Sequence, residues 1–243
     1  MRLDVALAER YSFTRNKAQQ LIALGLISVN GKSITKTSFE VTENDVIDIE
    51  EDRRVHWVSR SAEKLIGFLE KSDNEKLLQK VSGSTCLDVG ASTGGFTQVL
   101  LEYNAAHVDA VDVGTNQLHE TIRNDARVTS YEETDIRDFT SMNSYGIIVC
   151  DASFISLIEL FSSICSFADR ETDIILLFKP QFEVGKEHLR KTGVPKDEKS
   201  VQDAMNRFEK CVHDTGCEIL QKEKSTLVGE AGNQEWVYWI QKR

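Results

Sequence analysis

The sequence is poor in proline, in long apolar runs and in cysteine or histidine pairs spaced for a disulfide or a metal. It has 2 prolines among 243 residues. Its longest apolar runs, 174–178 and 147–150, are far shorter than the ~18 residues that a membrane-spanning helix needs. The five cysteines form no CxxC motif, the five histidines have no metal-ligand spacing, and no basic-then-apolar leader opens the chain. These absences argue against a membrane, secreted or metal-dependent protein and predict a cytoplasmic one with reduced thiols.

Negative charge dominates overall, but it is unevenly distributed. The chain has 29 Lys and Arg against 39 Asp and Glu, a net charge of −10. Residues 1–38 carry six basic and two acidic groups, whereas 39–52 carry seven acids and no base, and 61–243 carry 20 basic and 30 acidic groups. Since nucleic-acid binding depends on the local face, a basic face is most easily built from residues 1–38.

The N-terminal part has the pattern of a small α+β unit. Apolar residues recur at helical spacing over 3–11, and Thr14 is a typical N-cap for a second helix that ends before Gly25. Asn30-Gly31 is a strong hairpin signal, and 46–49 alternates like a strand. The expected division is a small domain over 1–52, a connector over 53–60 and a larger domain over 61–243.

This unit resembles a known RNA-binding domain. The segment RLDVALAERYSFTRNKAQQLIALGLISVNGK is similar to the S4 domain, in which helix two and the hairpin present basic side chains to structured RNA. The residues alone leave open a solvated basic face without a ligand. The expected RNA-binding residues are Arg2, Arg10, Arg15, Lys17, Lys32, Lys36 and Arg60.

The larger part alternates apolar runs with amphipathic segments. The expected strands are 85–89, 107–113, 128–131, 145–150 and 172–178, and the expected helices are 96–103, 117–123, 157–167 and 199–215. Two more strands, 217–227 and 235–241, close the chain without an intervening helix. Alternating strands and helices predict an α/β domain with a parallel sheet. The closing strand pair predicts the Rossmann-like fold of S-adenosylmethionine-dependent methyltransferases.

A glycine-rich turn follows the first strand. The segment DVGASTGGF, 88–96, lets the backbone approach a ligand, and Asp112 at the end of the second strand is suited to ribose hydroxyls. These features leave a nicotinamide dinucleotide, S-adenosylmethionine and a ligand-free packing turn open. Ser92 stands where G-x-G-x-x-G has its second glycine, and this weakens the case for a dinucleotide ligand. Asp135, after the third strand, is expected either to contact adenine or to be the N-cap of a short turn. The expected cofactor-binding residues are Asp88, Gly90, Ala91, Ser92, Thr93, Gly94, Gly95, Phe96, Asp112, Val113, Asp135 and Ile136.

Two charged residues follow apolar strands directly. Asp151 comes after the run 147–150, and Lys179 comes after 174–178. Ligands of open α/β sheets bind outside the carboxyl ends of the strands, so both side chains are expected in one crevice. A surface ion pair at the strand exits is the alternative.

Several blocks carry a second resemblance. DVGASTGGFT, VDVGTNQLHETIRNDARV, CDASFISL and FKPQFEVGKE resemble the TlyA-type (haemolysin-A-named) family of FtsJ-like RNA 2′-O-methyltransferases, in the same domain order from residue 2 to the C-terminus. The Lys-Asp-Lys-Glu set of that family maps onto Lys64, Asp151, Lys179 and Glu235. The family usually has two glycines where this chain has Ser61-Ala62, which leaves the backbone near Lys64 less determined.

The resemblance implies a monomeric enzyme that uses S-adenosylmethionine to methylate a cytidine 2′-oxygen in ribosomal RNA of an assembled subunit. Lys179 would take or steer the 2′-hydroxyl proton, Lys64 would disfavour its charged form, and Asp151 and Glu235 would hold both ammonium groups. The short ends of the chain resemble members that act on the large (50S) subunit, with the small (30S) subunit as an alternative. A non-catalytic RNA-binding or assembly factor stays open, and a cytolysin or an NAD-dependent oxidoreductase has less support.

Overall fold

The structure, a computed structural model, describes residues 1–11, 13–229 and 231–243. The chain divides into two compact units, Met1–Arg60 and Ser61–Arg243. The segment 53–60, expected as a connector, falls in the first unit and contains helix α3, Arg53–His56. Within the described residues, no helix has the length and apolar character needed to cross a membrane.

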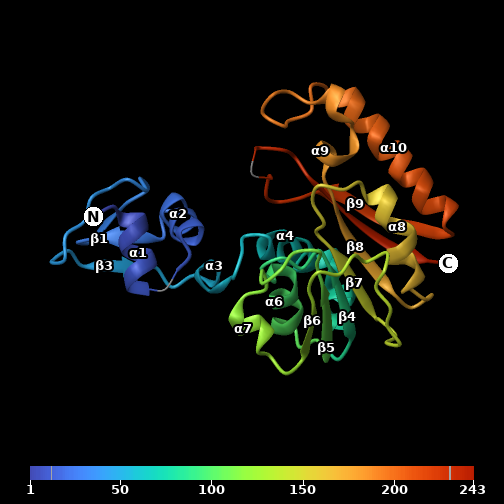
Figure 1. The fold of residues 1–243 in the computed structure, drawn as a ribbon, viewed down its shortest axis with the longest axis horizontal. Helices are drawn as coiled ribbons and strands as arrows, with labels where there is room; N and C mark the ends of the chain where they lie inside the picture. The colour runs from blue at the N-terminus through green and yellow to red at the C-terminus, as the bar shows by residue number, and fades with distance from the viewer. Residues whose placement is uncertain (12, 230) are drawn as a thin grey trace. The chain divides into compact units, whose positions relative to one another are not determined.

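The first unit has two helices packed on a small antiparallel sheet (Figure 1). Its elements are α1 Leu3–Tyr11, α2 Arg15–Ala23, β1 Ile27–Val29, β2 Lys32–Ser33 and β3 Ile47–Ile49, with strand order β2-β1-β3. The Thr14 side chain accepts a hydrogen bond from Lys17 N, so the predicted N-cap is confirmed. Val29 pairs with Lys32 across Asn30-Gly31, which confirms the hairpin.

The second unit is built on a seven-stranded sheet with the order β6-β5-β4-β7-β8-β10-β9. The parallel strands are β4 Thr85–Val89, β5 His107–Val111, β6 Val128–Tyr131, β7 Ile147–Cys150 and β8 Asp173–Phe178. The closing strands, β9 Cys217–Lys224 and β10 Trp236–Lys242, pair antiparallel with each other, and β10 also pairs antiparallel with β8. The predicted Rossmann-like methyltransferase topology is therefore confirmed.

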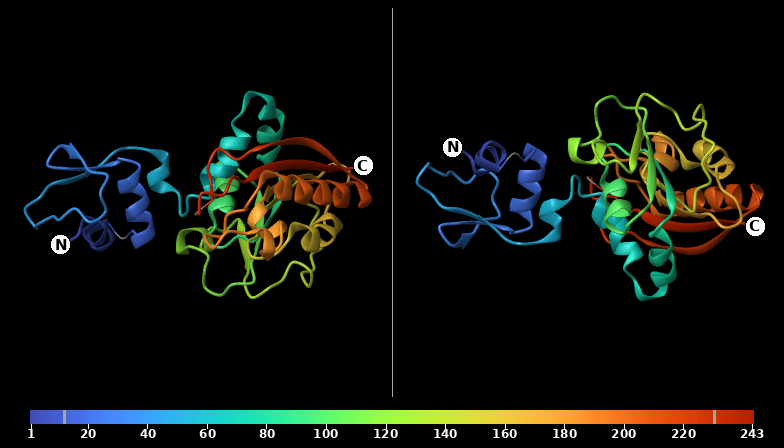
Figure 2. Two further views of the ribbon diagram at one scale, coloured as in Figure 1. Left: turned by 90° about the horizontal axis from the view of Figure 1, so that it is seen from above. Right: turned by 90° about the horizontal axis from the view of Figure 1, so that it is seen from below.

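Helices cover both faces of this sheet, with α4 and α6 on one face and α8 and α10 on the other (Figures 1 and 2). The helices of the unit are α4 Ala62–Leu69, η1 Ser72–Asn74, α5 Glu75–Val81, α6 Gly95–Glu102, α7 Glu120–Arg123, α8 Leu157–Ser166, α9 Pro180–Glu183, η2 Lys186–His188 and α10 Glu198–Asp214. Helix α10 shows why they dock: Asp197 caps it, and it buries Ala204, Phe208 and Val212, four residues apart on one stripe.

One helix begins later than its pattern predicts. A helix is expected from residue 117, but α7 begins at Glu120. The Glu132 carboxylate accepts hydrogen bonds from the backbone N–H groups of residues 116, 117 and 118. A side chain from beyond β6 therefore satisfies the backbone donors of the loop that precedes α7.

The strand order reverses its direction at β4, which marks one edge of the sheet as the place for a ligand. The chain runs outward from β4 to β5 and β6 on one side and to β7 and β8 on the other. A crevice forms at such a reversal, outside the carboxyl ends of the strands. Asp112, Asp151 and Lys179 each follow a strand directly at this edge.

Candidate functional site

A cavity of about 480 Å³ lies at the carboxyl ends of β4, β5 and β7. Gly90 and Ser92 of the glycine-rich turn line one side, and Asp151 and Ala152 line another. Gly90 has φ +78°, and a Cβ there would lie 3.0 Å from Ala152 Cα. The glycine therefore lets the turn after β4 approach the loop after β7, as the close-approach argument predicts.

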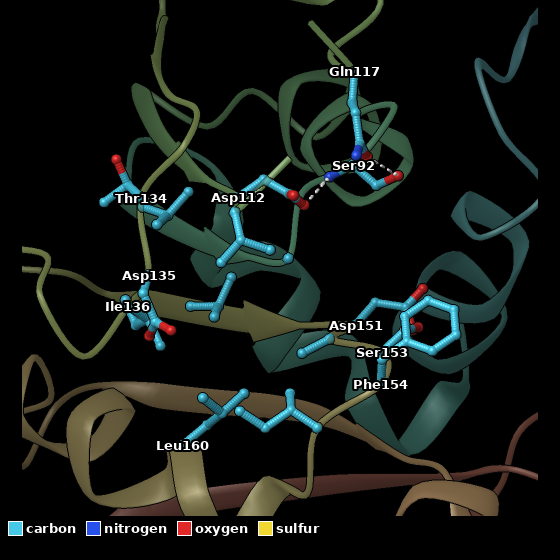
Figure 3. A pocket seen from close by; sticks show the side chains of 16 residues that line it. Ser92, Asp112, Gln117, Thr134, Asp135, Ile136, Asp151, Ser153, Phe154 and Leu160 are labelled. Atoms are coloured by element: carbon cyan, nitrogen blue, oxygen red, sulfur yellow. Dashed lines mark hydrogen bonds between the residues drawn. The ribbon is translucent and has the colours of Figure 1, made fainter. Parts of the chain in front are cut away.

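Asp112 lies beside Ser92 in the wall of the cavity and holds the loops around it (Figure 3). Its carboxylate accepts a hydrogen bond from Ser92 N at 2.7 Å and another from Gly114 N at 2.7 Å. Ser92 Oγ donates to Gln117 Oε1 at 3.1 Å. Each carboxylate oxygen keeps a second lone pair, so Asp112 can accept ribose hydroxyls while it holds the loop.

The base of the cavity is mostly apolar. Val89, Val111, Ile136, Ile155 and Leu160 line it, which suits a flat heterocycle.

The predicted residues Val113 and Asp135 also line the cavity. The Asp135 carboxylate accepts hydrogen bonds from the backbone and guanidinium of Arg137, which lowers its pKa. Asp135 therefore stabilises a turn, and its contact with a cofactor stays a prediction.

The remaining predicted cofactor residues do not line this cavity. Those in the turn and the first turn of α6 are Ala91, Thr93, Gly94, Gly95 and Phe96. Asp88 lies beneath them, fully buried, and accepts a hydrogen bond from Thr97 Oγ1 at 2.6 Å. Asp88 is thus a support beneath the turn, and its direct contact with a ligand, expected from its place in the motif, is wrong for this structure because no surface of it reaches the cavity.

The four residues of the Lys-Asp-Lys-Glu set meet in one buried cluster. Lys64 Nζ lies 2.6 Å from Glu235 Oε2 and 4.0 Å from Asp151 Oδ1, and Lys179 Nζ lies 2.6 Å from that same Asp151 oxygen. The side chains are 3–14% exposed. The charges alternate along the path Glu235–Lys64–Asp151–Lys179, here called the tetrad, so each buried charge has an opposite neighbour.

Three adjacent strands and one helix deliver these groups. Asp151 follows β7 and Lys179 follows β8. Because β10 is antiparallel and pairs Trp236 with Phe178, the next residue outward on each strand, Glu235 and Lys179, lies at the same sheet edge. Lys64 comes from α4, a regular helix despite the Ser61-Ala62 departure.

The loop before β10 leaves room for Glu235. A Cβ on Gly229 would lie 2.6 Å from Glu235 Oε1, a distance that side chains do not tolerate. Gly229 is therefore required wherever Glu235 keeps this position.

Ser153 and Phe154 were not predicted from the sequence. Lys179 Nζ donates to Ser153 Oγ at 2.7 Å and to the Asp151 carbonyl at 3.0 Å. Phe154, 92% exposed with φ +67°, lines the cavity beside Ser153. Their position directly after Asp151, at the end of a strand that points to the cavity, is the feature of the sequence that indicates them.

Glu183 joins the two loops that carry Asp151 and Lys179. It lies in α9, four residues after Lys179, and its carboxylate accepts hydrogen bonds from Leu157 N at 2.7 Å and Ser156 Oγ at 2.5 Å. These two donors begin α8, directly after the loop of Asp151. Burial raises the pKa of the Glu183 carboxyl, and the Ser156 and Leu157 hydrogen bonds oppose that shift.

Most predicted RNA-binding residues of the first unit are exposed: Arg2, Arg10, Arg15, Lys32 and Lys36. The buried Asp4 carboxylate accepts hydrogen bonds from Arg2 Nε at 2.9 Å and Arg15 Nε at 3.2 Å, and the Arg2 contact holds the pKa of Asp4 well below its usual range. Arg60 is half-buried.

Lys17 is a correction to the predicted RNA-binding set. It is 8% exposed, and its ammonium group donates to the carbonyls of Arg54 and Trp57. Lys17 therefore holds the segment around α3 and has no free face for RNA. Two aromatic residues of the same segment differ in burial: Trp57 is buried and therefore has a packing role, whereas His56 is exposed.

The comparisons with known proteins agree with this architecture. The FtsJ-like methyltransferase family matches residues 57–242, and the S4 domain family matches residues 1–47. The 23S rRNA (cytidine-2′-O)-methyltransferase TlyA of Campylobacter jejuni is 40% identical, covering 98% of each chain. The 16S/23S rRNA (cytidine-2′-O)-methyltransferase TlyA of Mycobacterium tuberculosis is 37% identical over 98% of this chain and 89% of its own. A Streptococcus thermophilus structure named after haemolysins matches with a TM-score of 0.75 at 28% identity, over 100% of this chain and 88% of that one.

Burial of Asp88 predicts a pH-dependent stability difference. Burial raises the pKa of Asp88 to about 7, the Thr97 hydrogen bond opposes this, and the nearby Asp151 charge adds to it. The folded state therefore binds this proton more tightly than the unfolded state, and the carboxylate destabilises the fold progressively as pH rises from about 4 to about 7. We expect the unfolding free energy of Asp88→Asn, minus that of the wild type, to increase over this range, by about 1.4 kcal/mol per unit of pKa shift.

Urea unfolding of both proteins at pH 5 and pH 8 measures this difference. Thr97→Val, which removes the opposing hydrogen bond, should enlarge the wild-type pH dependence. A difference between Asp88→Asn and wild type that is the same at both pH values would contradict the prediction.

Proposed function

The chain belongs to the FtsJ-like methyltransferase family, as a TlyA-type member with an S4 domain, and from this we propose that it methylates the 2′-oxygen of a cytidine ribose in ribosomal RNA. The names of the relatives suggest the reaction and the substrate. The buried tetrad beside the cavity is the observation that carries the proposal. A protein that only binds RNA gains nothing from dehydrating four charges, which costs folding free energy.

The cavity residues fit S-adenosylmethionine as the methyl donor. The two carboxylate oxygens of Asp112 suit the ribose hydroxyls, and the apolar base suits adenine against Ile136 and Leu160. The turn at Gly90 and Ser92 lies where the methionine part would extend toward Asp151. When bound, this donor supplies an electrophilic methyl carbon whose bonding electron pair leaves with sulfur.

Lys179 is the group proposed to accept the proton of the 2′-hydroxyl. A neutral amine keeps two N–H bonds, for which the Asp151 carbonyl and Ser153 Oγ are the acceptors, and a lone pair that can take up a proton. The oxygen forms its new bond to carbon as its proton passes to Lys179 Nζ.

Lys64 and Glu235 are proposed to act through Asp151. The Glu235 carboxylate holds the Lys64 ammonium group at 2.6 Å, and Lys64 in turn faces Asp151. This arrangement orients Asp151 toward Lys179 and keeps its position fixed during the proton transfer. Positioning of this kind supplies up to ~7–11 kcal/mol of barrier reduction in well-oriented systems.

The S4 unit is proposed to hold the ribosomal RNA through its exposed basic residues, Arg2, Arg10, Arg15, Lys32 and Lys36. The large subunit is the proposed substrate particle, in agreement with the 23S rRNA named for the Campylobacter jejuni relative. The Mycobacterium tuberculosis relative is named for both 16S and 23S rRNA, so the small subunit is the second particle to test.

Transfer of tritiated methyl groups tests this function. Purified 50S and 30S subunits from a strain without the gene are incubated separately with the full chain and labelled S-adenosylmethionine. We expect label on 50S rRNA, released as 2′-O-methylcytidine after digestion. Label on 30S as well would overturn the large-subunit assignment only. No label on either, with the cofactor bound, would overturn the proposed reaction.

Lys179→Ala should lower methyl transfer by about 10²- to 10⁴-fold, the usual contribution of a general base. Cofactor affinity should stay unchanged, because Lys179 does not line the cavity. Calorimetric titration with S-adenosylmethionine and single-turnover methylation measure the two quantities. Lys210→Ala, at an exposed position on α10, is the matched control for loss of one lysine. Loss of cofactor binding together with activity would assign Lys179 a structural role instead.

Glu183→Ala should lower kcat by about 10- to 100-fold through misplacement of the two loops, with the KM for cofactor unchanged. Glu183→Gln keeps an acceptor for Leu157 N and should recover most of kcat. Steady-state methylation of 50S subunits measures both variants. Equal losses of kcat in the two variants would contradict a role that depends on this hydrogen bond.

A further inference from the structure

A second cavity, of about 560 Å³, lies in the larger unit and shares no lining residue with the first. Pro180, Gln234 and Trp236 line it, and they directly flank Lys179 and Glu235 in the chain. Two cavities therefore adjoin the tetrad: Asp151 lines the first, and the chain neighbours of Lys179 and Glu235 line the second. None of the proposed cofactor contacts uses the second cavity.

The apolar lining of this cavity includes an aromatic side chain held in place. Trp236 is half-buried, and its ring meets Phe178 edge-on at a centroid distance of 6.5 Å. Pro180 and Met205, both buried, add apolar surface. A half-exposed indole with fixed orientation is the kind of surface on which nucleic-acid bases stack.

A buried amide in the lining points to a polar ligand. Asn233 is 4% exposed, and among the described residues its Nδ2 donates only to the Gly193 carbonyl, at 3.4 Å. Its Oδ1 is buried and has no hydrogen-bond partner among the described residues. Leaving such an acceptor unsatisfied costs free energy, so a ligand that donates an N–H to it would be favoured.

The rim of the cavity is basic. Arg190, Lys196 and Lys224 lie there, against Asp197 and Glu198. The Asp197 carboxylate is already used as the N-cap of α10, where it accepts a hydrogen bond from Ser200 N at 2.7 Å. Three cations against two carboxylates leave this lining with a net charge of +1 in a unit with 20 basic and 30 acidic residues, which favours an anionic ligand.

We propose that this cavity binds an unpaired nucleotide of the RNA strand that carries the target ribose, an inference that rests on the proposed function. The base stacks on Trp236 and donates an N–H to Asn233 Oδ1, and Arg190 and Lys224 contact the phosphates. A strand held here passes the tetrad on the way to the first cavity, so the site sets which ribose meets Lys179. Aromatic, amide and cationic groups around one cavity match the three parts of a nucleotide.

Photocrosslinking tests the site without relying on activity. The probe is a hexaribonucleotide of cytidines with one 4-thiouridine, irradiated with the full chain and mapped by mass spectrometry. We expect crosslinks within residues 232–236, retained when S-adenosylhomocysteine is added at saturation. Crosslinks confined to the first cavity or to residues 1–60 would overturn the proposal. Competition by the cofactor product would do the same.

Paired Trp236 variants separate stacking from folding. Trp236→Phe keeps an aromatic ring against Phe178 and should bind the hexaribonucleotide within about threefold of wild type. Trp236→Leu should weaken binding about tenfold, as expected for loss of one stacked base. Fluorescence anisotropy with a labelled probe measures both, and circular dichroism checks their folding. Equal affinities in the two folded variants would count against stacking on Trp236.

Kinetics on 50S subunits distinguish this proposal from the proposed function. Arg190→Ala with Lys224→Ala should raise the KM for subunits about tenfold and leave kcat and cofactor affinity unchanged. Lys199→Ala, whose side chain is 86% exposed on α10 and outside the cavity, is the control for loss of a surface cation elsewhere on the unit. If the wild type methylates subunits and the KM rises equally in the control and in the double variant, the proposed nucleotide site is overturned and the proposed function is not. A wild type that methylates no subunit overturns the function, and the crosslinks then decide the cavity.

Discussion

The structure depends above all on the burial of four alternating charges at one edge of the larger sheet. An isolated ammonium or carboxylate group in this environment would cost several kcal/mol, whereas each member of the tetrad has an opposite charge within 4.0 Å. Among the described residues, removal of Lys64 leaves Glu235 buried without an opposite charge, and removal of Asp151 does the same to Lys179, so the four must be positioned together. That requirement explains the docking of α4, the loop geometry at Gly229 and the link between the Asp151 and Lys179 loops through Glu183.

The direction of the last strand is part of the same constraint. In an all-parallel sheet, the residue before a strand lies at the opposite edge from the residue after its neighbour. Because β10 runs antiparallel to β8, Glu235 before β10 and Lys179 after β8 lie at one edge. The antiparallel ending therefore completes the tetrad, and it also brings Trp236 beside Pro180 to form the second cavity. One change of strand direction serves both features.

The sequence predicts those features that local pattern determines and misses those that depend on distant contacts. Apolar runs and strand-end rules led to the sheet, to Asp151 and to Lys179, because a residue after a buried parallel strand has few alternatives. Lys64 and Glu235 came only from family resemblance, since they meet over a separation of 171 residues that no local pattern encodes. The error at Lys17 has the same cause: helical spacing places it on a face, but the carbonyls of Arg54 and Trp57 approach that face from elsewhere in the chain. Asp88 was misassigned because its motif does not reveal how deeply β4 buries it.

Charge balance connects the tetrad to the chemistry of its cavity. With both lysines protonated the tetrad sums to zero, which is the least costly state to bury. A neutral Lys179 leaves one net negative charge, and a cationic ligand in the adjoining cavity offsets that charge where a neutral one would not. In the proposed reaction, proton uptake by Lys179 would return the tetrad to zero as the sulfonium ligand loses its own charge. Two carboxylates opposite two lysines are therefore suited to a methyl transfer that discharges a cation, and less suited to hydride transfer from a dinucleotide. Ser92, which lines the cavity where a dinucleotide motif has its second glycine, also favours a methyl donor over a dinucleotide.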